Sequence, residues 1–187
     1  MKKKGTILYS EICNEQLQDA ISYIMQAEKL PYGNITLDDL LIKAQLSDLK
    51  IKDYYSAEYF GAGAYIFFDK GTPVYVGKAK NFLHRFTSHR SIDVRGHWGW
   101  NALLQKICIN RLGYVNKTAH TRDYYAEALQ EAEQYEIVRI LRDDDSVDIS
   151  MIEKVLMRGI NHIHPLWNGR VKRVKHDYLQ KTIAELI

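Results

Sequence analysis

The stretch from residue 63 to residue 89 constrains the fold of this chain more than any other. Its sequence is GAYIFFDKGTPVYVGKAKNFLHRFTSH. Residues 64–68 are apolar and aromatic, which predicts a buried strand, and Asp69-Lys70-Gly71 predicts a turn into a second strand that Pro73 opens. Asn81 predicts the cap of a helix. The stretch therefore predicts a tight β-hairpin that runs directly into a helix.

Side chains that can bind phosphate or transfer protons lie along this predicted hairpin and helix. Tyr65 and Tyr75 fall on the two strands, and Arg85 and His89 fall one turn apart on the helix. Phenols, a guanidinium and an imidazole together can bind a phosphate and move a proton. The segment thus favours a site that cuts phosphodiester bonds. The alternative is structural, with buried aromatic residues in a chain of 13 tyrosines and ordinary surface charges.

The hairpin and helix resemble the GIY-YIG nuclease superfamily. The first tripeptide of that superfamily is present as Gly63-Ala64-Tyr65, and the second as Tyr75-Val76-Gly77. Alanine and valine stand at the two positions where the superfamily has isoleucine. The helix that follows carries Arg85 where the superfamily has an arginine, and His89 where some members have a histidine.

The resemblance extends to about residue 170. A helix predicted over 149–163 carries Glu153 where the superfamily has a glutamate, and Pro165 and Asn168 follow in the same order. The resemblance implies an α/β (α+β) fold with a small antiparallel three-stranded sheet flanked by helices. The β-branched residues of 136–141 predict the third strand.

The resemblance also implies roles for single residues. It makes Glu153 the ligand of Mg²⁺ (or Mn²⁺), because Mg²⁺ is usually held by one or two carboxylates together with water and phosphate oxygens. It implies that Tyr65 helps to deprotonate the attacking water, that Arg85 binds the scissile phosphate, and that His89 acts as an acid for the leaving oxygen or binds water. The implied catalytic set is Tyr65, Tyr75, Arg85, His89, Glu153 and Asn168.

Basic residues cluster around these motifs, although the net charge of the chain is only +3. Lysine and arginine contacts to phosphates supply affinity for DNA that does not depend on sequence. The alternative for these residues is a solvated surface. The residues expected to contact double-stranded DNA are Lys78, Lys80, Arg90, His97, Arg170, Lys172 and Arg173.

Three segments are expected along the chain. Residues 1–60 are predicted to form an N-terminal helical arm, in which Ser10 caps one helix and Thr36 caps another over 37–46. Residues 61–170 are expected to form the nuclease domain, with insertions around 90–134 that include helices over 98–112 and 124–132. Residues 171–187 are expected to form a basic tail that ends in an amphipathic helix over 178–187.

Composition excludes several classes of protein. Hydrophobic residues make up 46% and charged residues 26% of the chain, as in ordinary globular proteins. No apolar run approaches the ~20 residues that span a bilayer, and the first residues lack the apolar core of a signal peptide. Cys13 and Cys108 are far apart and form no CxxC. We expect a reduced, cytoplasmic setting without a structural zinc.

These observations lead to an expected function, a metal-dependent DNA endonuclease. Within the superfamily, a chain with a helical arm and mid-domain insertions is most similar to a type II restriction endonuclease. Cutting both strands of a palindrome implies a homodimer. Two alternatives stay open: a DNA-repair or structure-specific nuclease, and a DNA-binding module that has lost catalysis. No motif reveals which segment reads bases or which sequence is recognised.

Overall fold

A computed structural model describes residues 3–42, 56–92, 101–114, 122–169 and 174–187. Helices and strands alternate through these ranges. In chain order the elements are β1 (Thr6–Leu8), the 3-10 helix η1 (Tyr9–Glu11), α1 (Leu17–Gln26), β2 (Leu30–Pro31), the 3-10 helix η2 (Tyr32–Asn34), α2 (Leu37–Leu40), α3 (Ala57–Phe60), β3 (Gly63–Asp69), β4 (Thr72–Ala79), α4 (Phe82–His89), α5 (Ala102–Asn110), α6 (Arg122–Ala132), β5 (Glu136–Leu141), α7 (Ile149–Ile163), α8 (His176–Leu179) and α9 (Ile183–Leu186).

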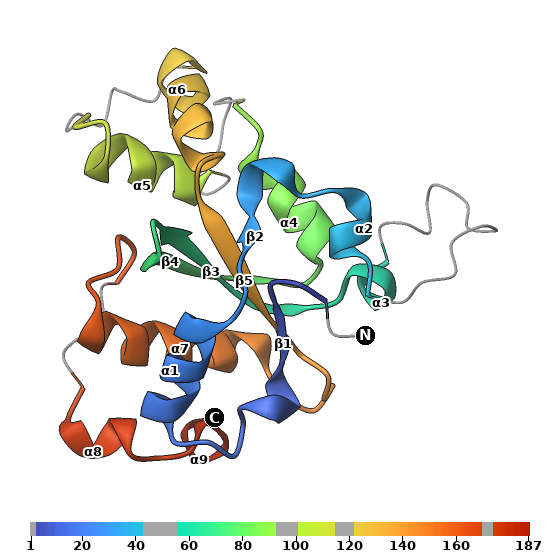
Figure 1. Ribbon diagram of the computed structural model, residues 1–187, viewed down its shortest axis with the longest axis vertical. Helices are drawn as coiled ribbons and strands as arrows, with labels where there is room; N and C mark the ends of the chain where they lie inside the picture. Colours follow the sequence, from blue (N-terminus) through green and yellow to red (C-terminus); the bar gives the residue numbers. More distant parts are fainter. Residues whose placement is uncertain (1–2, 43–55, 93–100, 115–121, 170–173) are drawn as a thin grey trace.

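A mixed sheet of five strands lies at the centre of the described residues (Figure 1). Its main order is β1-β5-β3-β4, and β2 also pairs with β5. Strand β3 is antiparallel to both β4 and β5, whereas β1 is parallel to β5. The predicted hairpin is confirmed: Lys70 and Gly71 have φ values of 48° and 80°, and positive φ at both central residues defines a type I′ turn.

Helices cover both faces of the sheet, so the fold is a three-layer α/β structure (Figure 1). Alternate side chains of β3 pack into the helical layers on opposite faces of the sheet. Tyr65 and Phe67 pack in the layer that holds α2, α4, α5 and α6, whereas Ile66 and Phe68 pack against α1 and α7. Burial of both faces explains why β3 is apolar almost throughout. None of the described helices is long and apolar enough to cross a membrane.

The N-terminal segment differs from the predicted helical arm. Its β1 and β2 belong to the central sheet, and its longest described helix, α1, packs on α7. Ser10 lies in a 3-10 turn, and α1 begins only at Leu17. These strands of three and two residues are too short to produce a periodic pattern, and they form because the edge of β5 is available. The Thr36 cap is confirmed, with a capping box to Asp39, although α2 ends at Leu40.

Most of the later elements agree with the sequence. The strand over 136–141 and the helix over 149–163 are confirmed as β5 and α7. The three-stranded sheet expected from these elements is, however, extended to five strands. The single terminal helix expected over 178–187 is wrong. Two short helices stand there instead, because Thr182 starts α9 with a capping box of its own to Glu185.

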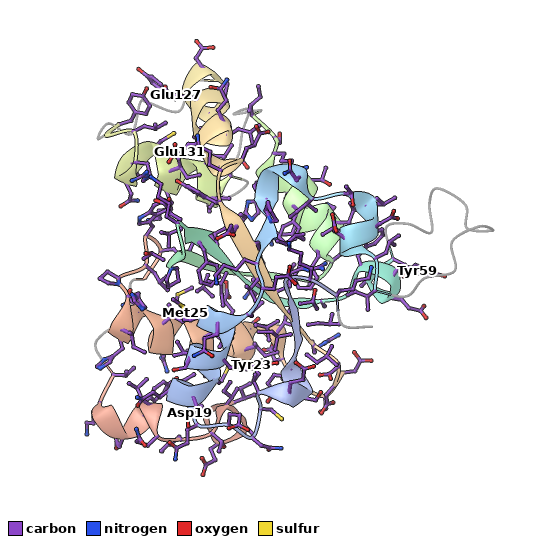
Figure 2. The ribbon with its side chains drawn as sticks, in the orientation of Figure 1. Asp19, Tyr23, Met25, Tyr59, Glu127 and Glu131 are labelled. Atoms are coloured by element: carbon purple, nitrogen blue, oxygen red, sulfur yellow. The ribbon has the colours of Figure 1, made fainter. Side chains whose placement is uncertain are left out.

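Helices α5 and α6 form a pair at one end of the molecule, beyond the sheet (Figure 1). Polar contacts from α6 reach residues at the end of α5 and the start of β5. Glu127 accepts a hydrogen bond from the Tyr114 hydroxyl at 2.5 Å, and Glu131 accepts one from Arg111 Nε at 3.1 Å. Figure 2 labels both glutamates on α6, far from α1. The pair is therefore joined by side chains that lie away from the motif residues.

Candidate active site

The two motif tyrosines lie side by side on neighbouring strands. Their rings stack with 6.3 Å between the centroids and 20° between the planes. In the strand register Tyr65 pairs with Gly77 and Tyr75 with Phe67. Both side chains are buried, and Tyr65 is only 1% exposed. The structure thus brings the two phenols together, as pairing of short antiparallel strands predicts.

Two motif positions, Gly63 and Gly77, need glycine because neighbouring atoms lie too close to leave room for a Cβ atom. A Cβ atom at Gly77 would collide with the hydroxyl group and ring of Tyr65, which lie across its backbone. A Cβ atom at Gly63 would collide with the carbonyl oxygen of Ile140 on β5. Gly77 therefore makes room for the phenol of Tyr65, and Gly63 lets β3 lie close against β5.

His89 is buried behind Tyr65. Its Nε2 lies 2.7 Å from the Tyr65 hydroxyl oxygen, and the residue is 1% exposed. Burial, followed by the positive charge of Arg85, lowers the pKa of His89 to about 3. The imidazole is therefore neutral near pH 7. Its Nδ1 has no hydrogen-bond partner in the part of the chain that the structure describes. This position suits contact with Tyr65 better than contact with a substrate.

The charges of Arg85 and Glu153 both act on the two phenols. Burial is the largest effect and raises the pKa of both tyrosines, that of Tyr65 far above its usual value. The negative charge of Glu153 raises these pKa values further, and the positive charge of Arg85 lowers them. Both charges are therefore close enough to influence proton loss from either phenol.

Glu153 forms an ion pair with Lys78. The Lys78 Nζ atom on β4 lies 3.3 Å from Glu153 Oε2 on α7, and it donates a hydrogen bond of 3.0 Å to Ser150 Oγ. Ser150 precedes Glu153 by one helical turn, so both oxygens face the same ammonium group. Lys78 was expected to contact DNA, and in this structure its charge is directed to the carboxylate.

A hollow of about 550 Å³ opens beside Lys78 and Arg85, between the N-terminal ends of α4 and α7. Its only acidic lining residue, Asp148, uses its carboxylate to accept a hydrogen bond from Ser150 N, which lowers the pKa of Asp148. The hollow is therefore mainly cationic and suits an anion such as a phosphate diester. Its lining residues are Lys78, Lys80, Asn81, His84, Arg85, Asp148, Ile149 and Ser150.

Asn168 lies against the outer edge of β4. Its side-chain Oδ1 accepts a hydrogen bond from Val76 N at 3.3 Å, and its Nδ2 donates one to Val76 O at 2.6 Å. Trp167 N donates to Val74 O at 2.8 Å. Asn168 therefore holds the strand of the second motif by backbone contacts, which agrees with an orienting role.

The other residues expected to bind DNA do not all reach the hollow. Lys80 lines it. Arg90 instead donates a hydrogen bond to Tyr32 O at 2.5 Å, and its guanidinium lies 4.9 Å from the Tyr32 ring centroid. Arg90 is thus engaged within the fold. The remaining candidates, His97, Arg170, Lys172 and Arg173, lie outside the described residues.

The donor atoms of the site fit magnesium better than zinc. Within the described ranges no group of three or more His, Cys, Asp or Glu side chains could hold a metal ion. Structural and catalytic zinc sites need at least three protein ligands, whereas Mg²⁺ keeps several waters and needs one or two carboxylates plus substrate phosphates. The Glu153 side chain is 21% exposed beside Lys78 and supplies one such carboxylate.

Comparison with known proteins adds no further assignment: no family model, curated protein or solved structure matches this chain. The resemblance to the GIY-YIG superfamily therefore rests on the sequence motifs alone.

Two features of the site were missed from the sequence, one partner residue and the burial of His89. Ser150 contacts Lys78, and its position three residues before Glu153 on a predicted helix was the available signal. The burial of His89 also had a signal, because Phe82, Phe86 and His89 follow the i, i+4, i+7 spacing of a buried helical stripe.

Proposed function

We propose that this chain is a metal-dependent endonuclease that hydrolyses phosphodiester bonds in double-stranded DNA, with a GIY-YIG type of site. One observation carries the proposal. Tyr65, Tyr75, Arg85 and Glu153 come from β3, β4, α4 and α7, yet the two phenols stack and the charges of Arg85 and Glu153 both act on them, beside a cationic hollow that Arg85 lines. Core packing needs no such meeting of phenols, guanidinium and carboxylate, whereas phosphodiester hydrolysis uses all three.

Binding of the phosphate falls to the cationic residues of the hollow. Arg85 presents a planar fork of N–H donors that matches two phosphate oxygens, and its charge stays fixed at all ordinary pH values. Lys80 and His84 line the same hollow further out and suit neighbouring backbone phosphates. Donors held in place before the reaction stabilise the charge that grows on the phosphate in the transition state.

Proton transfer falls to Tyr65. A phenolate at Tyr65 would take a proton from the attacking water, and neutral His89 would donate its Nε2–H to that phenolate oxygen at the observed 2.7 Å. The raised pKa of Tyr65 opposes formation of the phenolate. A divalent cation on Glu153 would supply positive charge that offsets the carboxylate and assists departure of the leaving oxygen. Arg85 lowers the phenol pKa from the other side.

Within this function, we favour a type II restriction endonuclease that acts as a homodimer in the cytoplasm. The extra helices α5 and α6, inserted between the arginine helix and β5, are support for this class, because they add surface beyond the small catalytic core. Such surface is what base recognition in the grooves requires.

The test is incubation of the purified chain with a large DNA of known sequence and Mg²⁺ or Mn²⁺. Discrete, reproducible fragments are expected for a restriction endonuclease. A smear or single-strand nicks would indicate a repair-like nuclease instead. A band shift without cutting, with either metal, would indicate a binding module and would refute the proposed activity. Glu153→Gln run in parallel excludes a contaminating nuclease.

A further inference from the structure

Lys78 lies against the carboxylate of Glu153, the group that would hold a divalent cation. The Lys78 Nζ atom lies 3.3 Å from Glu153 Oε2, and Ser150 Oγ accepts a hydrogen bond from the same ammonium group. In the described ranges Glu153 belongs to no group of three or more His, Cys, Asp or Glu side chains that could hold a metal ion. The ammonium group of Lys78 and a divalent ion would therefore compete for the carboxylate of Glu153.

We propose that Lys78 holds Glu153 while the substrate is absent, and that a phosphate diester in the hollow draws Lys78 away. The divalent cation and the substrate then bind cooperatively. The identity of the substrate in this proposal rests on the proposed function. The cooperativity itself concerns the contacts among Lys78, Glu153 and the phosphate, and it can be measured without any cleavage.

The surroundings of Lys78 allow this exchange without movement of the backbone. Strand pairing fixes its Cα opposite Ala64. The side chain, by contrast, is 42% exposed and lines the hollow, where a phosphate would arrive. Lysine carries a compact charge on a flexible stem, so it can transfer from one oxygen ligand to another. A phosphate that removes this ammonium from Glu153 also removes the charge that repels the metal.

The first experiment measures Mn²⁺ binding to the DNA-free protein by calorimetry. Lys78→Met should tighten binding by about tenfold, because it removes a positive charge about one ion-pair distance from the metal. Lys80→Met is the matched control: it removes the same charge from the same hollow, and no contact with Glu153 is seen for it. It should change Mn²⁺ affinity by less than about twofold. Glu153→Gln should abolish the site.

A second, smaller substitution tests the same contact in case Lys78→Met disturbs the fold. Ser150→Ala keeps Lys78 and its ion pair but removes the second oxygen that holds the ammonium group. Mn²⁺ binding should tighten by about two- to threefold. Thermal melting of all variants, measured without metal, should stay close to that of the wild type, since Lys78 is substantially exposed.

The second experiment measures the coupling from the side of the DNA, because coupling between two ligands is reciprocal. Fluorescence anisotropy of a labelled duplex is recorded with and without Ca²⁺ at constant ionic strength. Ca²⁺ should tighten binding to the wild type and to Lys80→Met by the same factor. In Lys78→Met this factor should fall by about tenfold.

Three results would overturn the proposal: Mn²⁺ binding to Lys78→Met no tighter than to the wild type, an equal gain in Lys80→Met, or an intact Mn²⁺ site in Glu153→Gln. Failure of the nuclease function would look different. If the variants show these affinities but the protein cuts no DNA, the proposed exchange of Lys78 stands and the proposed nuclease function is refuted. If the protein cuts DNA but Lys78→Met leaves the Mn²⁺ affinity unchanged, the nuclease function stands and the proposed exchange is refuted.

Discussion

The site has an inner and an outer half that are stabilised in different ways. The inner half, here called the phenol cluster, consists of Tyr65, Tyr75 and His89, which are almost fully buried and held by ring stacking and one hydrogen bond. The outer half, the cationic wall, consists of Lys78, Lys80, His84 and Arg85 along the hollow. Packing fixes the phenol cluster, whereas solvent and mutual repulsion leave the wall free to respond to a ligand. Changes in the cluster should therefore alter stability and reaction together, and changes at the exposed wall residues Lys80 and His84 should alter binding alone.

The largest fall in cleavage rate should come from replacing Glu153, the carboxylate between the two halves. Glu153→Gln should lower the cleavage rate by ~10³-fold or more, because it removes the charge that holds the metal. DNA binding should stay within a few-fold, since the wall is intact. Glu127→Gln makes the same change on α6, far from the site, and should cut normally. Residual cutting above a tenth of the wild-type rate would remove Glu153 from the metal role.

The next largest effect should come from the phenol cluster itself. Tyr65→Phe should lower the cleavage rate by ~10²-fold, the range expected for a lost proton-transfer group. It should also lower the free energy of unfolding by about 1–3 kcal/mol, because the buried Nε2 of His89 loses its partner.

A double variant separates these two consequences. In Tyr65→Phe/His89→Leu both polar groups are gone, so thermal stability should return toward that of the wild type. The cleavage rate should stay low if the phenol acts in the reaction. Recovery of cleavage together with stability would mean that Tyr65 is only structural.

A smaller effect should appear in the pH dependence of stability. His89 has a pKa of about 3 when folded and near 6.5 when unfolded, so the unfolded chain binds an extra proton between these values. This contribution to stability is present above pH 6.5 and is lost as the pH falls toward 3, by about 1.4 kcal/mol per pH unit. His89→Gln should flatten the decline measured by denaturant unfolding between pH 6.5 and 4.5. His84→Gln is the matched control, because it makes the same replacement on the exposed side of α4, away from the buried imidazole.

The smallest effect should come from the outer wall. Lys80→Ala/His84→Ala should weaken binding to all duplexes alike and lower the slope of log affinity against log salt by about one unit. Thermal stability should not change, because both side chains are exposed. An altered preference among DNA sequences would show instead that this wall reads bases.

Features with a local sequence signal were predictable, and contacts between distant segments were not. The hairpin and α7 were predictable because their signals are local: the turn at Lys70 and Gly71, and a helix that begins after Asp148. The meeting of the two phenols followed from strand pairing. The five-stranded sheet was not predictable, since β1 and β2 have too few residues for a pattern. Contacts between distant segments, such as Lys78 with Glu153, leave no local pattern either.

The hydrogen bonds of Asn168 have a consequence for self-association. Among the described strands β4 is the last on its side of the sheet, and such a strand is a natural template for pairing with another chain. The amide group of Asn168 satisfies both the N–H and the C=O of Val76, as a neighbouring strand would. One side chain thereby occupies the pairing groups of Val76, so another strand could pair with β4 at this point only by displacing Asn168.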